Sequence, residues 1–365
     1  MAKEYELEIQ GQPSRYSSQE RHFKMYFAEP EEGADASTGI FLFIAGYGGH
    51  AMSNVYQKMR RELADQYNCI TLQCDYLGCW HMQNDHHLTV TEKMLRQVLS
   101  PREYRMLTRD YEANKDLLEG KILSDYISLQ ETAEDFNEMG LWQAMDNLMA
   151  LQVLLDIVQE NGISICRDRI YVFGQSHGAY LAYLCNFLAP NLFTGIIENS
   201  AYLFPYFLRH DREVIKVGSV LTLRKIYHYL IADQDIDADS YDLSKLYQGF
   251  QNQSRIISYH GAADEMIPLQ EKQKFLNQIQ GVSLHIVTEK EVDGKKFGSA
   301  GHSLEANFFL VIEEAMQELE EMPLCFRESN EFPANIFFQT KKYRYEVHWE
   351  TGIPLLHYCS NTLNN

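Results

Sequence analysis

The feature that most constrains the fold of this chain is a serine flanked by glycines, placed between a strand-like and a helix-like segment. Residues 174–178, Gly-Gln-Ser-His-Gly, fit the pattern G-x-S-x-G. Residues 170–173 are β-branched and aromatic, as in a buried parallel strand, and residues 179–188 have the composition and length of a helix. Glycines on both sides of the serine relieve crowding on a strained strand-to-helix turn. The pattern predicts that Ser176 is a nucleophile; an ordinary turn with an incidental serine is the alternative.

Strand-like and helix-like segments alternate along much of the chain. The expected strands span residues 5–9, 23–27, 41–44, 69–74, 170–173, 195–199, 256–259 and 283–287, and the expected helices span residues 54–67, 141–157, 179–188, 269–279 and 304–319. The first two strands have the alternation of an antiparallel pair, and the later ones are apolar runs separated by helices. This order favours a mostly parallel sheet covered on both faces, in a single α/β domain spanning residues 1–365.

Three segments depart from this alternation. Residues 80–139 contain no strong strand and are interpreted as a polar, helical insertion, and residues 202–250 as a second insertion, irregular and partly helical. Insertions in this architecture emerge at the catalytic edge, so both are expected to form a lid over the site. Within residues 322–365, apolar and charged side chains alternate from Tyr343 to Trp349, which predicts a C-terminal β-hairpin packed on the body of the domain.

Composition restricts the partners of the chain. A formal net charge of −19 at pH 7 should repel nucleic acid and anionic membrane surfaces. Apolar runs are too short for a membrane span, and the first eight residues lack the layout of a signal peptide. The seven cysteines are odd in number and show no C-x-x-C spacing, so we expect a reduced, cytoplasmic protein without a disulfide framework. The oligomeric state stays open.

A base and an orienting acid are expected after the serine in the sequence. A serine hydroxyl becomes a good nucleophile only when a base takes its proton, and an acid must orient that base. Asp264 follows the apolar run 256–259, and His302 follows the run 283–287 within a glycine-rich loop. Loops that leave parallel strands meet at one edge of the sheet, so both side chains are expected beside Ser176. Ser176, Asp264 and His302 are the predicted triad.

Each member of this pair also has a simpler interpretation. Asp264 could serve only as a carboxylate at a helix N-terminus, and the adjacent Glu265 competes with it for the role of acid. His302 could be a helix-capping neighbour without chemistry.

The oxyanion of an acyl-transfer reaction needs backbone N–H donors. One is expected from His177, the residue after the nucleophile, and the other from the glycine-rich loop at residues 45–50. Tyr47 is the first choice in that loop and Gly48 the second. A phosphate-binding loop is the alternative, but no lysine follows the glycines as the phosphate motif requires.

Other polar clusters are weaker candidates. Residues 233–239 resemble a calcium loop, but the sixth position is Ala238 and the twelfth is Ser244 instead of glycine and glutamate. A histidine cluster at positions 81, 86 and 87 lacks the paired spacing of a metal site. We therefore predict neither a metal nor a cofactor. Asn199 and Ser200 end an expected core strand at the catalytic edge, where they would contact substrate or cap the strand.

Taken together, these motifs resemble the α/β-hydrolase superfamily. The resemblance rests on the G-x-S-x-G turn at residues 174–178, the loop 45–50, the run His260-Gly-Ala-Ala-Asp-Glu-Met-Ile-Pro268 and the late Gly301-His302. It covers roughly residues 35–80 and 140–320. It implies a serine hydrolase with helical lid insertions, and it implies Asp264 as the acid because the family uses the shorter side chain there.

Residues 174–180 and 260–264 look most like the prolyl-oligopeptidase and acylaminoacyl-peptidase branch, with its related esterases. The chain departs from those peptidases because no propeller precedes the core. It also has Ala45-Gly46 where many esterases carry His-Gly. In addition, the chain is similar to an uncharacterised bacterial family of such hydrolases that is linked to flagellar or surface-glycan modification.

The resulting hypothesis is a serine hydrolase that cleaves a small-molecule or glycan ester, such as an O-acyl group on a carbohydrate, through an acyl-enzyme. An acyltransferase that passes the acyl group to a sugar with the same triad is the close alternative. A non-catalytic accessory or binding protein in glycan modification is the alternative from a different class.

Overall fold

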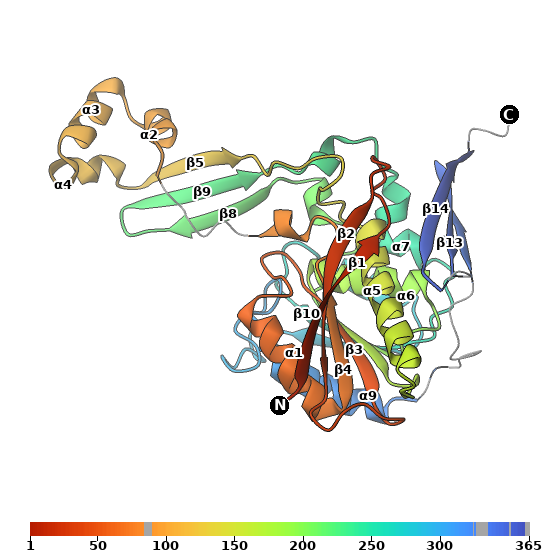
Figure 1. Cartoon of the computed structure of the whole chain (residues 1–365). Helices are drawn as coiled ribbons and strands as arrows, with labels where there is room; N and C mark the ends of the chain where they lie inside the picture. Colours follow the sequence, from red (N-terminus) through yellow and green to blue (C-terminus); the bar gives the residue numbers. More distant parts are fainter. Residues whose placement is uncertain (84–89, 324, 326–334, 350–351, 362–365) are drawn as a thin grey trace.

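A twisted, mostly parallel sheet forms the centre of the molecule (Figure 1). The computed structural model describes residues 1–83, 90–323, 325, 335–349 and 352–361. Within these residues the sheet has eight strands in the order β1-β2-β4-β3-β6-β7-β10-β11. The strands are β1 (Lys3–Gly11), β2 (Arg21–Glu29), β3 (Gly39–Ile44), β4 (Cys69–Cys74), β6 (Ile170–Gln175), β7 (Gly195–Asn199), β10 (Arg255–Gly261) and β11 (Val282–Val287). The β1-β2 and β2-β4 pairs are antiparallel and the others are parallel, which confirms the predicted class.

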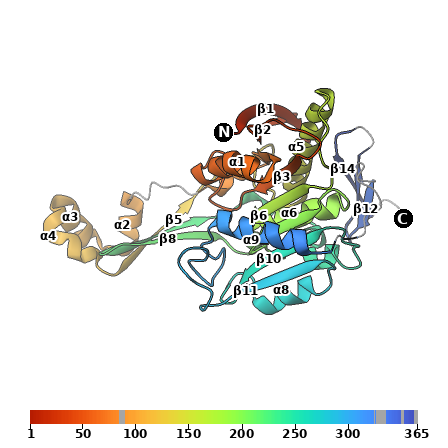
Figure 2. The ribbon, with the colours of Figure 1, turned by 90° about the horizontal axis from the view of Figure 1, so that it is seen from below.

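Helices cover both faces of the sheet (Figure 2). They are α1 (Asn54–Tyr67), α5 (Leu141–Glu160), α6 (His177–Leu188), α8 (Leu269–Leu276) and α9 (Phe308–Glu321). Alternate residues of β3 enter two different cores: Ile40 and Leu42 pack in the cluster that contains α5 and α6, whereas Phe41 and Phe43 pack in the cluster that contains α1 and α9. Because both faces are buried, the central strands carry continuous apolar runs. These runs are the signal by which the sequence predicts them. No described helix is long and apolar enough to span a bilayer.

The two insertions share a second, smaller sheet that projects from the body as an arm (Figure 1). Its strands are β5 (Lys121–Ile127), β8 (Arg212–Val217) and β9 (Leu221–Tyr227) in the order β5-β9-β8, and the helices α2 (Glu92–Val98), α3 (Pro101–Arg109) and α4 (Tyr111–Asn114) lie at its outer end. Residues 80–139 were expected to be helical with no strong strand; they contain the helices α2, α3 and α4 but also the strand β5, which is a correction, and residues 202–250 are more regular than expected. Strand β5 pairs in parallel with β9, about a hundred residues away, so no local hairpin signal marks it.

The C-terminal segment forms a three-stranded antiparallel sheet, one strand more than the expected hairpin. It consists of β12 (Ile336–Gln339), β13 (Tyr343–His348) and β14 (Leu355–Ser360). The side chains of Tyr345, Val347 and Leu356 join the main core, so this sheet is anchored to the body by its apolar face.

A buried carboxyl group lies at the start of α5 and makes the stability of the protein pH-dependent. Glu138 Oε2 accepts hydrogen bonds from the backbone N–H groups of Gly140 (2.9 Å) and Trp142 (3.1 Å), and Tyr241 Oη donates to Oε1 at 2.6 Å. Burial raises the pKa of Glu138 to about 7 from its ordinary value of 4.5, although these hydrogen bonds oppose the shift. Glu138 is thus protonated in the folded protein at pH values where it is ionised in the unfolded chain.

We expect Glu138→Gln to remove a loss of stability that occurs between about pH 4.5 and pH 7. In that window the folded state holds the proton more tightly, so the free energy of unfolding falls as the pH rises, by roughly 3 kcal/mol in total. Urea unfolding of the wild type and the variant across this range measures the effect. Glu134→Gln, which changes an exposed carboxyl group, is the control. Parallel curves for wild type and Glu138→Gln would contradict the assignment.

Candidate active site

Ser176 stands on the tight turn between β6 and α6, in a strained backbone conformation with φ 55° and ψ −117°. Such dihedral angles are costly for a residue other than glycine and persist only where the surrounding structure enforces them. A Cβ atom on Gly178 would lie 2.0 Å from the carbonyl oxygen of Ile44, and one on Gly174 would lie 2.4 Å from the carbonyl oxygen of Gly178. The two glycines are therefore required because β3 and the turn itself approach so closely.

Ser176, His302 and Asp264 lie in a continuous hydrogen-bonded row. His302 Nε2 is 2.8 Å from Ser176 Oγ, and His302 Nδ1 is 2.9 Å from Asp264 Oδ2. Because a carboxylate can only accept, Nδ1 carries the proton and donates it to Asp264, which leaves Nε2 free to accept from the serine hydroxyl. This is the arrangement that a base needs in order to activate a serine.

Asp264 is held in place by its own loop after β10. Its Oδ1 accepts from the backbone N–H groups of Met266 (2.9 Å) and Ile267 (3.0 Å). Burial alone would raise the pKa of Asp264. The hydrogen bond that His302 donates, together with the electrostatic attraction of its imidazole, outweighs burial and lowers the pKa of Asp264 below its ordinary value. Asp264 is thus ionised at neutral pH. Glu265, the competing residue, is exposed to solvent, and the hydrogen bond to His302 comes from Asp264.

Asn199 and Ser200, which the sequence suggested as substrate contacts, lie fully buried beneath the loop that carries His302. Asn199 Nδ2 donates to the carbonyl oxygen of Ser303 at 3.1 Å, and Ser200 Oγ accepts from the N–H of Ser303 at 3.1 Å. Two further residues that the sequence analysis missed support the same loop: Gln175 Nε2 donates to Ser303 Oγ at 2.6 Å, and the ring of Tyr202 stacks on His302 at 5.4 Å and 8°. No local pattern distinguishes them, because their partner lies about a hundred residues away.

A buried ion pair fixes the backbone next to Tyr202. Glu198, on β7, and Lys272, on α8, are fully buried, and their charged groups are 2.6 Å apart. The pair binds both backbone polar groups of Ala201. Glu198 Oε2 accepts from the N–H of Ala201 at 2.9 Å, and Lys272 Nζ donates to its carbonyl oxygen at 3.5 Å. Ala201 directly precedes Tyr202, so the ion pair fixes the start of the segment that stacks on the histidine.

The two expected oxyanion donors belong to segments in contact. The ring of Tyr47 meets the ring of His177 edge-on at 5.3 Å, and a Cβ atom on Gly46 would lie 2.4 Å from the carbonyl oxygen of Gln175. The N–H of Gly48, the second choice, donates to the carbonyl oxygen of Met82 at 3.0 Å. Because that bond engages Gly48, the geometry favours Tyr47 as the donor from this loop.

The side chain of His177 does not compete with His302 as a base. It is fully buried, and its Nε2 lies 2.6 Å from Gln143 Oε1 on α5. Burial lowers the pKa of His177 to about 3, so the ring stays neutral at physiological pH. The contact with Gln143 ties the first turn of α6 to α5.

The carboxylates at 233–239 form ion pairs or hydrogen bonds with neighbouring side chains. Asp233 contacts His228 at 3.0 Å, Asp235 pairs with Lys342, Asp237 accepts from Tyr345 Oη at 2.9 Å, and Asp239 pairs with Lys245. His81 lies 3.3 Å from Asp135, whereas positions 86 and 87 fall outside the described residues. In the part of the chain that the structure describes, His, Cys, Asp and Glu form no group of three or more suited to a metal ion.

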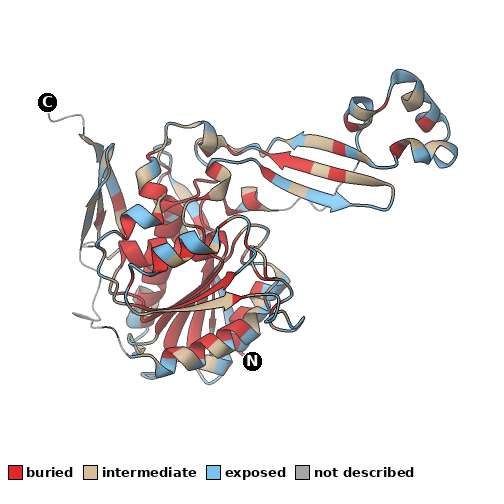
Figure 3. Ribbon diagram, turned by 180° about the vertical axis from the view of Figure 1, so that it is seen from behind, coloured by how far each residue is buried: buried red, intermediate tan, exposed pale blue. Residues whose placement is uncertain are grey.

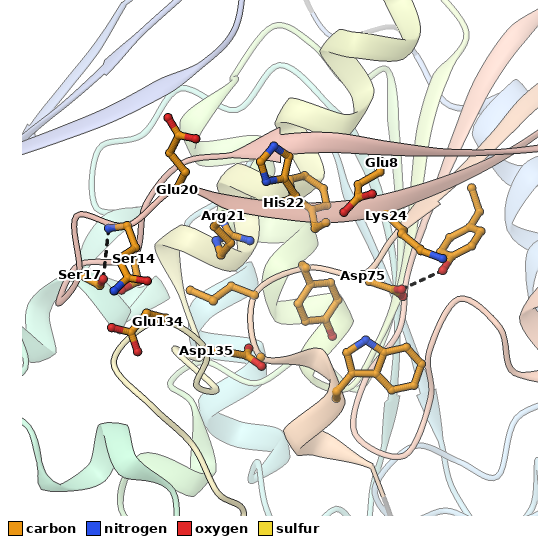
Figure 4. Close-up of a pocket in the computed structure, with 17 residues that line it drawn as sticks. Glu8, Ser14, Ser17, Glu20, Arg21, His22, Lys24, Asp75, Glu134 and Asp135 are labelled. Carbon is orange, nitrogen blue, oxygen red and sulfur yellow. Dashed lines mark hydrogen bonds between the residues drawn. The ribbon is translucent and has the colours of Figure 1, made fainter.

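A cavity of about 580 Å³ lies beside β2 (Figure 4). It lies between β2 and the segment that follows β4, and several carboxylates and the half-exposed indole of Trp80 line it. The lining carboxylates are Glu8, Glu20, Asp75, Glu134 and Asp135. Tyr76, in its wall, donates through Oη to the carbonyl oxygen of Ala45 at 2.6 Å, and Trp80 packs on His50 at 4.8 Å. Two lining residues thus contact the loop at residues 45–50, but neither that loop nor Ser176, Asp264 or His302 lines the cavity.

Comparison with known proteins identifies the fold. A sequence family described as "Protein of unknown function (DUF2920)" matches residues 113–216, and no curated protein matches the chain. A "putative dipeptidyl aminopeptidase IV" from Bacteroides ovatus is similar in structure with a TM-score of 0.50 at 11% identity, over 88% of this chain and 36% of that one. Two further solved structures have lower TM-scores. Acylaminoacyl peptidase from Pyrococcus horikoshii has a TM-score of 0.47 at 12% identity (89% and 43% of the two chains), and Est1E from Butyrivibrio proteoclasticus with bound ferulic acid has 0.42 at 13% identity (85% and 98%). The chain has the α/β-hydrolase fold.

Proposed function

We propose that the protein is a serine hydrolase that cleaves a carboxylic ester through an acyl-enzyme on Ser176. The observation that carries this proposal is the row formed by Ser176, His302 and Asp264, with distances of 2.8 and 2.9 Å, on a turn whose backbone strain holds the hydroxyl toward the base. A structural serine has no need of a strained turn, an oriented imidazole and a buried carboxylate together.

The proposed reaction proceeds in two halves. Ser176 Oγ attacks the ester carbonyl carbon while its proton passes to His302 Nε2, and the N–H groups of His177 and Tyr47 stabilise the negative charge on the carbonyl oxygen. The C–O bond to the alcohol then breaks, and His302 protonates the leaving oxygen. A water molecule, deprotonated by His302, attacks the acyl-enzyme in the same way and releases the acid and free Ser176. Ionised Asp264 stabilises the imidazolium in both halves.

Covalent labelling tests the proposal directly. A fluorophosphonate probe should modify the folded wild-type protein at one site, and peptide mass analysis should place the adduct on the peptide that contains residues 174–178. A folded protein that takes up no probe, or an adduct elsewhere in the chain, would contradict the proposed nucleophile.

An acyltransferase with the same triad is the second candidate, and the burial of the site favours it. Ser176 is only 4% exposed. Aromatic rings contact its neighbours, because Tyr47 meets His177 edge-on and Tyr202 stacks on His302. The rings of Tyr47, Phe207 and Tyr229 form one cluster there, with centroids 4.7 to 6.3 Å apart. We propose that the inner parts of the insertions act as a lid which limits water, so that a bound hydroxyl group can take the acyl group instead.

We further propose that the alcohol part of the substrate is a carbohydrate, bound over the cavity whose wall residues Tyr76 and Trp80 contact the loop at residues 45–50. Carboxylates accept hydrogen bonds from sugar hydroxyls, and an exposed indole offers a flat apolar surface on which a sugar ring can pack. The carboxylates would not contribute to the binding of a simple alkyl ester, which has no hydroxyl group to donate.

Substitution of the exposed tryptophan separates these substrate classes. Trp80→Ala should raise KM for an O-acetylated oligosaccharide by about tenfold, because it removes the stacking surface, and should leave KM for a small aryl acetate unchanged. Steady-state kinetics on both substrates, with Met52→Ala as a control at another exposed apolar position, measures the difference. An equal change for both substrates would argue against a sugar site in the cavity.

A further inference from the structure

A chain of hydrogen bonds connects the side chains of the two residues whose backbone N–H groups the proposed mechanism uses. His177 Nε2 lies 2.6 Å from Gln143 Oε1. Gln143 Nε2 in turn donates to Asn137 Oδ1 at 2.8 Å, and Asn137 Nδ2 donates to Tyr47 Oη at 2.9 Å. Because the rings of Tyr47 and His177 also meet edge-on, the four side chains form a closed circle of contacts. Asn137 and Gln143 are called the amide bridge below.

The direction of each hydrogen bond in the bridge is fixed. The carbonyl oxygen of Leu77 can only accept, and it lies 2.7 Å from Gln143 Nε2, so this end of the amide is its nitrogen. The two protons of Nε2 are used by Leu77 and Asn137, which leaves Gln143 Oε1 as the acceptor for His177. Burial lowers the pKa of His177 to about 3, so the neutral ring carries its one proton on Nε2. Each donor therefore faces one acceptor along the whole chain of bonds.

The amide bridge is shielded from bulk water, which could otherwise replace a lost partner. Asn137, Gln143 and His177 are fully buried, in the body of the molecule, where the central elements are buried as well (Figure 3). A buried amide that loses its partner is left unsatisfied, and hydrogen bonds in such surroundings are stronger than in water. The hydroxyl of Tyr47 is thus held at a set distance from His177.

The bridge restrains a loop whose backbone is adaptable. Tyr47 follows β3, and His177 begins α6 directly after β6. The parallel pairing of β3 with β6 brings the loop and the turn side by side. The loop contains glycines at positions 46, 48 and 49, which allow many backbone conformations. A side-chain tie from Tyr47 to His177 supplies the restraint that such a backbone lacks.

We propose that Asn137 and Gln143 are positioning residues, which set the spacing of the two N–H donors of the oxyanion hole. The proposal rests on the proposed hydrolase function and adds residues that act through Tyr47 and His177. In both halves of the reaction a negative charge develops on the carbonyl oxygen, and its donors stabilise it only if they lie where that charge forms. Loss of the bridge should therefore slow acylation and deacylation alike and leave substrate binding unchanged.

Asn137→Ala should lower kcat for a short-chain aryl ester by about thirtyfold and leave KM within about twofold, a smaller loss than removal of a donor itself causes. Tyr47→Phe should have a similar effect, because it removes the hydroxyl that accepts from Asn137 and retains the backbone N–H. Both changes break the same hydrogen bond, so the double variant should be no slower than Asn137→Ala. Steady-state kinetics measures kcat and KM.

A trifluoromethyl ketone provides a readout that a merely structural role would not change. Ser176 Oγ adds to the ketone carbon while His302 takes the serine proton, and the adduct carries a negatively charged oxygen that needs the same donors. Its inhibition constant should rise in Asn137→Ala and in Tyr47→Phe by about the factor by which kcat/KM falls. Tyr47→Phe removes only a hydroxyl group, so it tests the bond even where Asn137→Ala does not fold.

A second buried asparagine provides the matched control. Asn186 is also fully buried and donates through Nδ2 to Tyr247 Oη at 3.1 Å, but it lies near the far end of α6 from His177. Asn186→Ala and Tyr247→Phe should lower the midpoint of thermal unfolding and retain the wild-type kcat and inhibition constant.

The results separate the two proposals. Wild-type kinetics in Tyr47→Phe, or an equal loss of kcat in Tyr47→Phe and Tyr247→Phe, would overturn the role of the amide bridge. If a fluorophosphonate labels Ser176 in those same proteins, the proposed hydrolase function still stands. A folded wild type that takes up no label would instead remove the function on which the bridge depends.

Discussion

Ser176→Ala should reduce kcat for a short-chain aryl ester by about a million-fold and abolish labelling by a fluorophosphonate. In the proposed mechanism the hydroxyl oxygen, which lies 2.8 Å from His302 Nε2, forms the covalent bond to the acyl group. The oxyanion donors would remain, so a residual rate above that of uncatalysed hydrolysis is expected. Stopped and continuous assays of ester hydrolysis measure kcat, and thermal unfolding checks that the protein is folded.

An exposed serine gives the matched control for this change. Ser164→Ala removes a hydroxyl group from the surface, away from β6, and should retain wild-type turnover. If Ser176→Ala kept more than about a hundredth of wild-type kcat, the serine would not be the nucleophile and the row of hydrogen bonds would be structural.

Asp264→Asn should lower kcat by about ten thousand-fold while the fold is retained. The carboxylate accepts the proton of His302 Nδ1 at 2.9 Å, and this bond keeps Nε2 unprotonated and directed at the serine. An asparagine can donate to Nδ1 instead, which moves the proton to Nε2 and leaves the imidazole unable to act as a base. Steady-state kinetics with the same aryl ester measures the loss.

Glu265→Gln is the control that the sequence itself provides. It removes the neighbouring carboxyl group, which is exposed, and should leave kcat within a few-fold of wild type. A large loss in Glu265→Gln together with a small loss in Asp264→Asn would reverse the assignment of the acid. The double variant Ser176→Ala/Asp264→Asn should be no slower than Ser176→Ala, because the residues act as one unit.

The elements of the central sheet could be predicted because their signals are local. Strand β6, the turn at Ser176 and helix α6 occupy consecutive residues, and burial on both faces gives each central strand an apolar run. The residues Asp264 and His302 could also be predicted, because a parallel sheet directs the loops after its strands to one edge. Their order along the chain then follows from the order of the strands.

The support around His302 and the arm could not be predicted, because they depend on pairings between distant residues. Asn199 and Ser200 hold Ser303 from more than a hundred positions away, and β5 pairs with β9 over a similar separation. A side chain that bonds to the backbone of a distant loop has no characteristic neighbours in sequence. A strand of an exposed arm likewise lacks the continuous apolar run that marks the strands of the core.

The sequence by itself determined the nucleophile pattern, the α/β class and the candidate acid and base, since each rests on residues adjacent in the chain or on the regular alternation of strands and helices. Only the tertiary structure decided that Asn199 and Ser200 contact the histidine loop, and that the two insertions combine into one arm. The physical reason is that burial and hydrogen bonding between remote segments depend on how the whole chain packs. A short stretch of sequence contains only one of the two partners of each such contact, so it does not specify the other.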